Sequence, residues 1–254
     1  MVVIMTKSVK IIISLAIIIV LAAGGYAGNM FGLFNQGNYG DYTPVRNEAT
    51  SSPINGKTVI FLGSSVTFGY GSLGTSFVEF LEKADGIIPV KEAVSGTTLA
   101  DIKKNSYVSR LKSIDTAIRA DAFVCQLSTN DATKNIPLGT LSTGTDSASF
   151  DTSTVIGAIE YIINYVNDTW HCPVIFYTNT RYESENYKKM VDALSEISEK
   201  YDITVIDLWN NEELNNISDE KRGLYMVDSI HPTRAGYCEW WLPEFQKALY
   251  AVIK

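Results

Sequence analysis

Short apolar runs alternate with helical patterns from residue 57 to the C-terminus, and this alternation constrains the fold more than any other feature of the sequence. The runs are rich in β-branched residues and are bounded by turn residues, as buried parallel strands usually are. Five segments have this character: Thr58–Leu62, Pro89–Val94, Ala122–Leu127, Val174–Tyr177 and Ile203–Leu208.

Helical periodicity lies between and after these runs. It is clearest over Thr154–Asn167, where apolar residues recur on one face, and it also covers Ser184–Tyr201 and Thr233–Ile253. Parallel strands need crossover connections, and right-handed crossovers place the helices on both faces of the sheet. The sequence therefore predicts an α/β protein, a three-layer α/β/α sandwich with a five-stranded parallel sheet.

Length and charge limit the number of domains and the class of partner. A chain of 254 residues with 46% hydrophobic content can build one sizeable core but hardly two. The net charge of -7 argues against nucleic acid, because affinity for nucleic acid rests largely on Lys and Arg.

The N-terminus has the pattern of an export signal. Lys7 and Lys10 precede the uncharged run Ile11–Ala23, and small residues suited to cleavage follow it. Residues 1–28 are thus expected to be a signal peptide or an uncleaved anchor, and the protein to be secreted or anchored to the outer face of the cytoplasmic membrane. Residues 29–56, rich in Gly, Asn, Ser and Thr, are expected to form a flexible linker, and residues 57–254 the folded domain.

Polar and glycine residues follow each of the first three predicted strands. Ser65 comes after the first strand, Gly96 after the second and Asn130 after the third. Ligands of open parallel sheets bind beyond the carboxyl ends of the strands, so these residues are expected to meet at one edge.

Only one of the two histidines can reach that edge. His171 directly precedes the fourth strand and belongs at the opposite edge, whereas His231 lies in a loop after the last strand. Asp228, three residues earlier, is close enough to orient the imidazole. A serine hydroxyl needs a neighbouring base to become a good nucleophile, so Ser65, His231 and Asp228 are candidates for a catalytic triad.

The negative oxygen that forms during attack on a carbonyl requires hydrogen-bond donors. The sequence offers the backbone N–H of Ser65, the backbone N–H of Gly96 and the side-chain amide of Asn130 as an oxyanion hole.

On these residues the chain resembles the SGNH hydrolases, also called GDSL esterases and lipases. Ser65, Gly96, Asn130 and His231 match the four positions that name the family, and Asp228 completes its Asp-x-x-His motif. The resemblance implies a flavodoxin-like sandwich and a serine esterase mechanism. In two places the chain departs from the family pattern: Ser64 stands where Asp is usual, and Ser128 where Gly is usual, which leaves the hydrogen bonding around the nucleophile open.

The function expected from these observations is hydrolysis of carboxylic esters through an acyl-serine intermediate, with short acyl groups such as acetyl on carbohydrate as substrates. Alternatives are an O-acyltransferase or a lysophospholipase/lipase with the same triad, and a non-catalytic carbohydrate-binding module. No cofactor and no metal is expected, because two histidines at opposite edges cannot supply a His-rich ligand set. The oligomeric state stays open, and the three cysteines, an odd number, imply no disulfide framework.

Overall fold

The computed structural model describes residues 7–42 and 51–254, and its centre is a parallel sheet of five strands in the order β2-β1-β3-β4-β5. The strands are β1 (Thr58–Gly63), β2 (Ile88–Ala93), β3 (Ala122–Gln126), β4 (Val174–Tyr177) and β5 (Thr204–Ile206). All four strand pairs are parallel, and Ile60 of β1 aligns with Val90 of β2 and with Phe123 of β3. The predicted α/β/α sandwich and its five parallel strands are confirmed.

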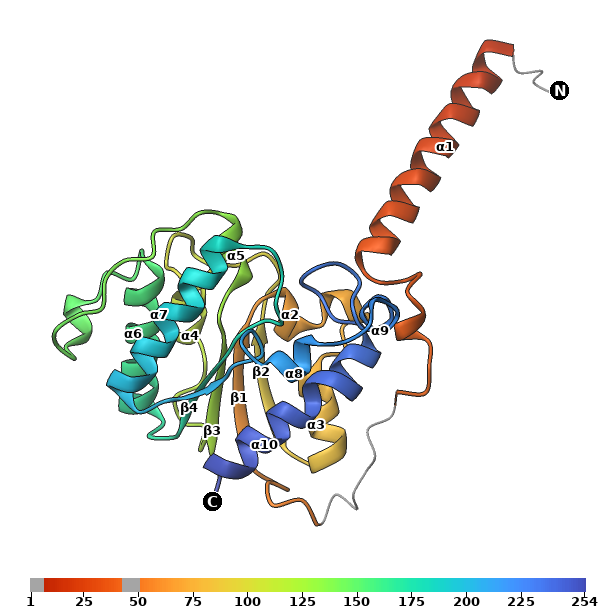
Figure 1. Cartoon of the computed structure of the whole chain (residues 1–254). Helices are drawn as coiled ribbons and strands as arrows, with labels where there is room; N and C mark the ends of the chain where they lie inside the picture. Colours follow the sequence, from red (N-terminus) through yellow and green to blue (C-terminus); the bar gives the residue numbers. More distant parts are fainter. Residues whose placement is uncertain (1–6, 43–50) are drawn as a thin grey trace.

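Helices cover both faces of the sheet (Figure 1). One face carries α4 (Tyr107–Leu111), α6 (Val155–Thr169) and α7 (Glu185–Tyr201), and the other carries α3 (Phe77–Asp85) and α10 (Leu242–Val252). Shorter helices follow the carboxyl ends of the strands: α2 (Ser65–Phe68), α5 (Thr129–Thr133), α8 (Glu212–Asn215) and α9 (Asp219–Tyr225), with the 3-10 turn η3 (Tyr70–Ser72). The 3-10 turn η4 (Ser147–Ser149) instead lies beside α6.

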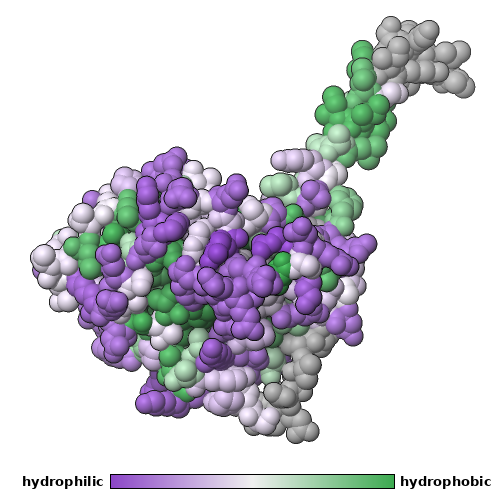
Figure 2. Space-filling model, viewed as in Figure 1, coloured by the Kyte–Doolittle hydropathy of each residue, from purple (hydrophilic) through white to green (hydrophobic). Residues whose placement is uncertain are grey.

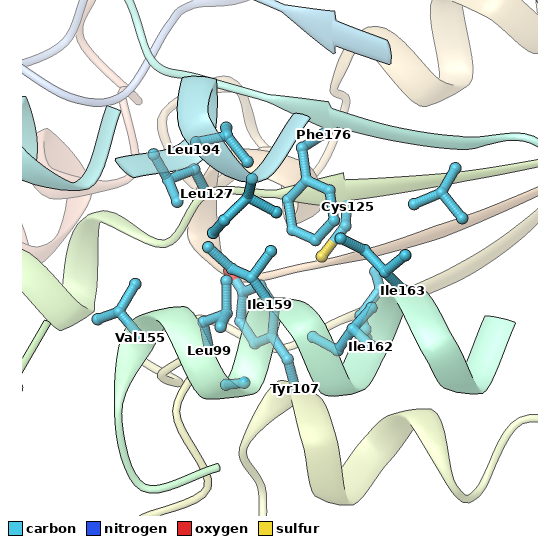
Figure 3. Close-up of a cluster of buried hydrophobic side chains, with 14 of the residues drawn as sticks. Leu99, Tyr107, Cys125, Leu127, Val155, Ile159, Ile162, Ile163, Phe176 and Leu194 are labelled. Atoms are coloured by element: carbon cyan, nitrogen blue, oxygen red, sulfur yellow. The ribbon is translucent and has the colours of Figure 1, made fainter. Parts of the chain in front are cut away.

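Alternating side chains of the strands build two separate cores. Ile60 and Leu62 of β1 point into the core beneath α4, α6 and α7, whereas Val59 and Phe61 point into the core beneath α3 and α10. Figure 3 shows part of the first core, where Tyr107 and Ile159 meet the strand residues. Since strands buried on both faces carry no exposed positions, their sequences read as continuous apolar runs.

The last helical segment begins at Arg234, one residue after the predicted start, and is irregular. A π-helical turn, η5, spans Gly236–Trp241 before α10 continues the helix. The Thr233 hydroxyl accepts the Gly236 N–H, so Thr233 caps the first turn, while Pro232 pairs with Met226 in an isolated antiparallel bridge before the helix.

The N-terminal helix α1 (Lys7–Met30) stands away from the domain (Figure 1). Its segment Ile12–Met30 is long and apolar enough to cross a membrane, and none of it is buried. Figure 2 shows an apolar surface over the outer part of the helix and less apolar residues where it meets the domain. A helix of this kind is compatible with a signal sequence or an anchor.

The predicted linker 29–56 differs from expectation in the part that the structure describes, because several of its residues are buried against the domain. In the 3-10 turn η1 (Gln36–Asn38), Gly37 and Asn38 are buried, with Asn38 only 3% exposed, whereas Gln36 is exposed. Near the other end of the range, Ile54 is fully buried. The Gly and Asn content that suggests flexibility instead serves close backbone approach and side-chain hydrogen bonds; residues 43–50 lie outside the described residues.

Candidate active site

Three neighbouring strands bring the predicted residues to the carboxyl edge of the sheet. The chain turns sharply at Ser64 after β1, and α2 begins with Ser65. Gly96 follows β2, and Asn130 lies in the first turn of α5, after β3. Because β2, β1 and β3 are adjacent, these loops meet beside the point where the strand order reverses.

A continuous chain of hydrogen bonds joins the serine, the histidine and the aspartate. His231 Nε2 lies 2.8 Å from Ser65 Oγ, and His231 Nδ1 lies 2.8 Å from Asp228 Oδ2. The histidine side chain is 16% exposed. With Nδ1–H donating to the carboxylate, Nε2 is left as an acceptor for the serine hydroxyl proton.

Asp228 also holds its own loop. Its Oδ1 accepts the backbone N–H groups of Ile230 and His231, each at 2.8 Å. Burial alone would raise the pKa of Asp228, but the His231 hydrogen bond and charge, together with the two backbone donors, outweigh burial and keep the pKa below its usual value. Asp228 is therefore ionised at neutral pH, and its carboxylate can accept the hydrogen bond from His231 Nδ1.

The two remaining predicted residues lie in the adjoining loops. Gly96 is exposed and has φ +80°, a conformation that favours glycine, and a Cβ placed there would meet no protein atom within 4 Å. The Asn130 amide donates to Ser64 Oγ and to the Thr97 carbonyl, each at 3.1 Å. Both amide hydrogens thus have protein acceptors, one of them on the residue directly before Ser65.

Asp131 connects the second and third loops. Its carboxylate accepts the backbone N–H groups of Leu99 at 2.7 Å and Ala100 at 3.0 Å. Burial raises the pKa of Asp131, and these backbone donors only partly offset the effect. The side chain is fully committed to holding the loop that carries Gly96.

Gln126, the last residue of β3, supports the turn that carries Ser65 and was not singled out from the sequence. Its Oε1 accepts the backbone N–H groups of Ser64 and Thr67 at 2.9 and 3.3 Å, and the Thr67 hydroxyl at 2.9 Å. The turn that presents Ser65 is thereby tied to β3. The available signal was a single amide in an otherwise apolar strand.

Arg110 is a second supporting residue that sequence reasoning missed. It is 8% exposed, and it donates to the carbonyl of Gly63 at 2.7 Å, to the Thr97 hydroxyl at 3.1 Å and to Glu92 at 2.9 and 3.0 Å. The guanidinium joins the ends of β1 and β2 to the loop after β2. An arginine on a helix between apolar residues gave no sequence cue to this role.

Comparison with known proteins agrees with this geometry. A family model of GDSL-like lipases and acylhydrolases matches residues 61–238, well over half of the chain. The chain belongs to the GDSL-like lipase/acylhydrolase family. It is a carboxylic ester hydrolase of the SGNH type.

Solved structures share the fold. One is 27% identical with a TM-score of 0.66, covering 78% of this chain and 98% of the other. A candidate GDSL-like lipase from Bacteroides ovatus is 17% identical with a TM-score of 0.58, covering 78% and 99%. The acetyl xylan esterase AlAXEase is 15% identical with a TM-score of 0.57, covering 76% and 99%. Comparison with curated proteins finds no match.

The two departures from the GDSL family pattern have a structural account in this chain. The Ser64 hydroxyl donates to Gln126 Oε1 at 3.3 Å and accepts from Asn130, so it links the nucleophile turn to α5. The Ser128 side chain is buried and donates to the Thr97 carbonyl at 3.4 Å. The short hydroxyl side chains of Ser64 and Ser128 therefore connect the loops of this GDSL-family site.

The other residues considered from the sequence lie apart from the triad. His171 directly precedes β4, at the opposite edge of the sheet. Cys125, Cys172 and Cys238 are all free. Burial raises the pKa of Cys172 and of Cys238 to about 11, so these thiols are protonated at neutral pH and are poor nucleophiles.

Proposed function

We propose that the chain hydrolyses carboxylic esters through an acyl-serine intermediate formed on Ser65. His231 Nε2 takes the hydroxyl proton as Ser65 Oγ bonds to the ester carbonyl carbon, and it returns that proton to the departing alcohol. A water molecule, deprotonated by the same nitrogen, then releases the acid. Asp228 keeps the imidazole in the required tautomer and stabilises its cation. The observation that carries this proposal is the chain of two 2.8 Å contacts through His231.

The oxyanion hole is proposed to consist of the N–H of Ser65, the N–H of Gly96 and the amide of Asn130. The open space at Gly96 supports this assignment, since a substrate can approach the backbone there. Asn130 has to exchange one of its two protein acceptors for the oxyanion. Its contact with Ser64 Oγ places the amide beside the nucleophile, so a small rotation is sufficient.

The substrates are proposed to be short acyl esters, in particular acetyl groups on carbohydrate. Exposed hydroxyl groups flank two of the site residues, Ser95 beside Gly96 and Ser229 beside Asp228, and such groups suit a hydrated sugar better than a long acyl chain. The shared fold with an acetyl xylan esterase supports the same class.

The site of action is proposed to be the outer surface of the cytoplasmic membrane, with α1 as an export signal that is retained as an anchor. Figure 1 shows α1 leaving the domain at the end of the sheet where α2 begins. The catalytic edge thus lies on the anchored side of the domain, close to glycans of the cell surface.

The test combines turnover and labelling. Purified full-length protein in detergent should hydrolyse 4-nitrophenyl acetate and release acetate from acetylated xylan, and a fluorophosphonate probe should label Ser65. The Ser65→Ala variant should lose both reactions while keeping its melting temperature. Absence of turnover and of labelling in the wild type would overturn the proposal.

A substrate panel separates the remaining family chemistries. Long-chain 4-nitrophenyl esters and lysophospholipids should be poorer substrates than acetyl esters. Addition of an acceptor sugar should leave acetate as the main product; formation of acetylated acceptor would instead assign acyl transfer.

A further inference from the structure

The segment Phe31–Tyr39, here called the docked segment, follows α1 directly and lies on the loops of the catalytic edge. Asn35 caps η1 and donates to the carbonyl groups of Gly223 at 3.2 Å and Met226 at 3.0 Å. Met226 is the first residue after α9 and begins the loop that carries the triad aspartate and histidine. The docked segment is thus bonded to the start of this loop.

Asn38 bonds to η3 and to the residues that follow the same loop. Its amide donates to the carbonyl groups of Gly32 at 2.8 Å and Gly71 at 2.9 Å, and its Oδ1 accepts the Arg234 N–H at 2.8 Å. Arg234 lies three residues after His231, and Gly71 belongs to η3 and lies against the His231 Cβ atom and the Pro232 carbonyl. Asn38 is 3% exposed and satisfies all these groups at once.

The backbone of the docked segment approaches its neighbours too closely for a side chain at the glycine positions of the contact. A Cβ on Gly37 would lie 1.9 Å from the Leu224 carbonyl oxygen, and one on Gly71 would lie 2.9 Å from His231 Cβ. Gly32 has φ +73°, and its Cβ would lie 2.2 Å from the Gly71 carbonyl oxygen. Backbone packed this closely has few alternative arrangements, so a shift of the docked segment is transmitted to its neighbours.

An aromatic contact completes the connection. The Phe31 ring lies 4.6 Å from the Tyr70 ring, which in turn lies 5.2 Å from the His231 imidazole. Tyr70 is therefore held between the first residue after α1 and the catalytic imidazole.

We propose that the docked segment positions the Asp228–His231 loop, and that Asn38 is its main positioning residue. The proposal rests on the esterase mechanism proposed above, because its readout is the chemistry at Ser65. Asn38 touches no reacting atom and acts through the two backbone segments that flank His231. Removal of its side chain frees the histidine loop, so that the 2.8 Å contact with Ser65 Oγ is populated for less of the time.

The variant that tests this is Asn38→Ala in the full-length protein, with Asn215→Ala as matched control. Asn215 likewise bridges backbone groups, donating to the carbonyl groups of Leu208 and Asn211, each at 2.7 Å, and accepting the Arg181 N–H at 2.8 Å, but it does not contact the histidine loop. Both variants lose a comparable set of hydrogen bonds and should lose similar thermal stability.

Only Asn38→Ala should have a lower kcat. Misplacement of a catalytic group by about 1 Å can cost about 100-fold in rate, so a fall in kcat of about 10- to 100-fold is expected, with KM for 4-nitrophenyl acetate within about twofold of wild type. The rate constant of fluorophosphonate labelling should fall in proportion, while its end point, which counts folded sites, stays near one per chain. Asn215→Ala should keep the wild-type kcat per labelled site.

A second variant keeps the test independent of folding. Phe31 is 44% exposed, so Phe31→Leu should fold normally, and loss of the ring against Tyr70 should still lower kcat several-fold. Wild-type kcat per labelled site in both Asn38→Ala and Phe31→Leu would overturn the positioning role. Failure of the esterase proposal is a separate result, seen as absence of turnover and labelling in the wild type itself.

Discussion

Exchange of Asp228 for Asn changes one atom at the centre of the site and should nearly abolish turnover without unfolding the loop. The Asn carbonyl oxygen can still accept the Ile230 and His231 N–H groups that Asp228 Oδ1 accepts at 2.8 Å. The new NH2 group would then face His231 Nδ1. Because two donors cannot bond to each other, the imidazole must move its proton to Nε2, where it points at Ser65 Oγ and blocks removal of the serine proton.

The expected loss is large. The same exchange in serine proteases lowers kcat about 10,000-fold. Asp228 has a side chain that is 40% exposed, so water can compete at Nδ1, and a loss of about 1,000- to 10,000-fold is expected, equal to about 4 to 5.5 kcal/mol of barrier. The assay is kcat on 4-nitrophenyl acetate, with the amount of folded protein measured by thermal unfolding.

Asp228→Ala is the control for the loop. It removes the backbone acceptor as well, so its melting temperature should fall further than that of Asp228→Asn, by the equivalent of about 1 kcal/mol for partly exposed donors. Retention of more than a tenth of wild-type kcat in Asp228→Asn would refute the tautomer argument. So would a loss of activity that merely follows the unfolded fraction.

The pH dependence of stability follows from the same residue. The folded-state pKa of Asp228 is below its unfolded value of about 3.9, so its stabilising contribution is fully present above that value and is lost as the pH falls through the folded pKa. The difference in unfolding free energy between wild type and Asp228→Asn should therefore not decline between about pH 8 and pH 5, and it should shrink below about pH 4. A difference that already declines near pH 6 would contradict the lowered pKa.

Three further substitutions test the surrounding supports. Gly96→Ala should fold, with a loss of about 1 to 2 kcal/mol in unfolding free energy because of the positive φ at this position. It should also lower kcat, because the new methyl group enters the space beside the proposed oxyanion donor. Unchanged kcat would remove Gly96 from the proposed oxyanion hole. Gln126→Leu should lower the unfolding free energy by about 1 to 3 kcal/mol, because the Ser64 N–H and the Thr67 hydroxyl lose their buried acceptor. Chemical denaturation measures this loss. Asp131→Asn should cost a similar amount, because its NH2 group would face the N–H of Leu99 or Ala100, and a neutral result would show that the loop is held by other contacts.

The architecture and the convergence of Ser65, His231 and Asp228 could be predicted because each depends on a short, regular pattern. Buried parallel strands read as continuous apolar runs, and sheet topology then places whatever follows each strand at one edge. Position alone separated His231 from His171. Strand ends were uncertain by one or two residues because the final residue of a parallel strand is fixed by its neighbour's register: β5 is only Thr204–Ile206, although the apolar run extends over Ile203–Leu208.

The residues that support the site could not be predicted from the sequence, because their partners are backbone groups brought together by tertiary packing. Nothing near Gln126 in the sequence shows that its amide oxygen meets the turn after a different strand, and Arg110 reaches three separate segments. Asn38 bonds to Gly71 and to Arg234, which lie 33 and 196 positions away in the sequence. Sequence composition reports the flexibility of an isolated segment, whereas these contacts depend on surfaces that exist only after the domain has folded.

The docked segment also changes what the N-terminal part of the chain can do. A flexible tether would let the domain rotate freely beneath α1, but Asn38 and the close approach at Gly37 fix the first residues after α1 to the catalytic edge. Small-residue cleavage positions at residues 23–27 lie before this segment, so the segment stays with the domain whether the leader is retained or removed. With α1 retained, the orientation of the triad relative to the membrane would be set by packing rather than by linker length. Soluble protein beginning at Gly28 and membrane-anchored protein should then have the same kcat on 4-nitrophenyl acetate, because both keep the docked segment; they should differ only on substrates fixed to a surface.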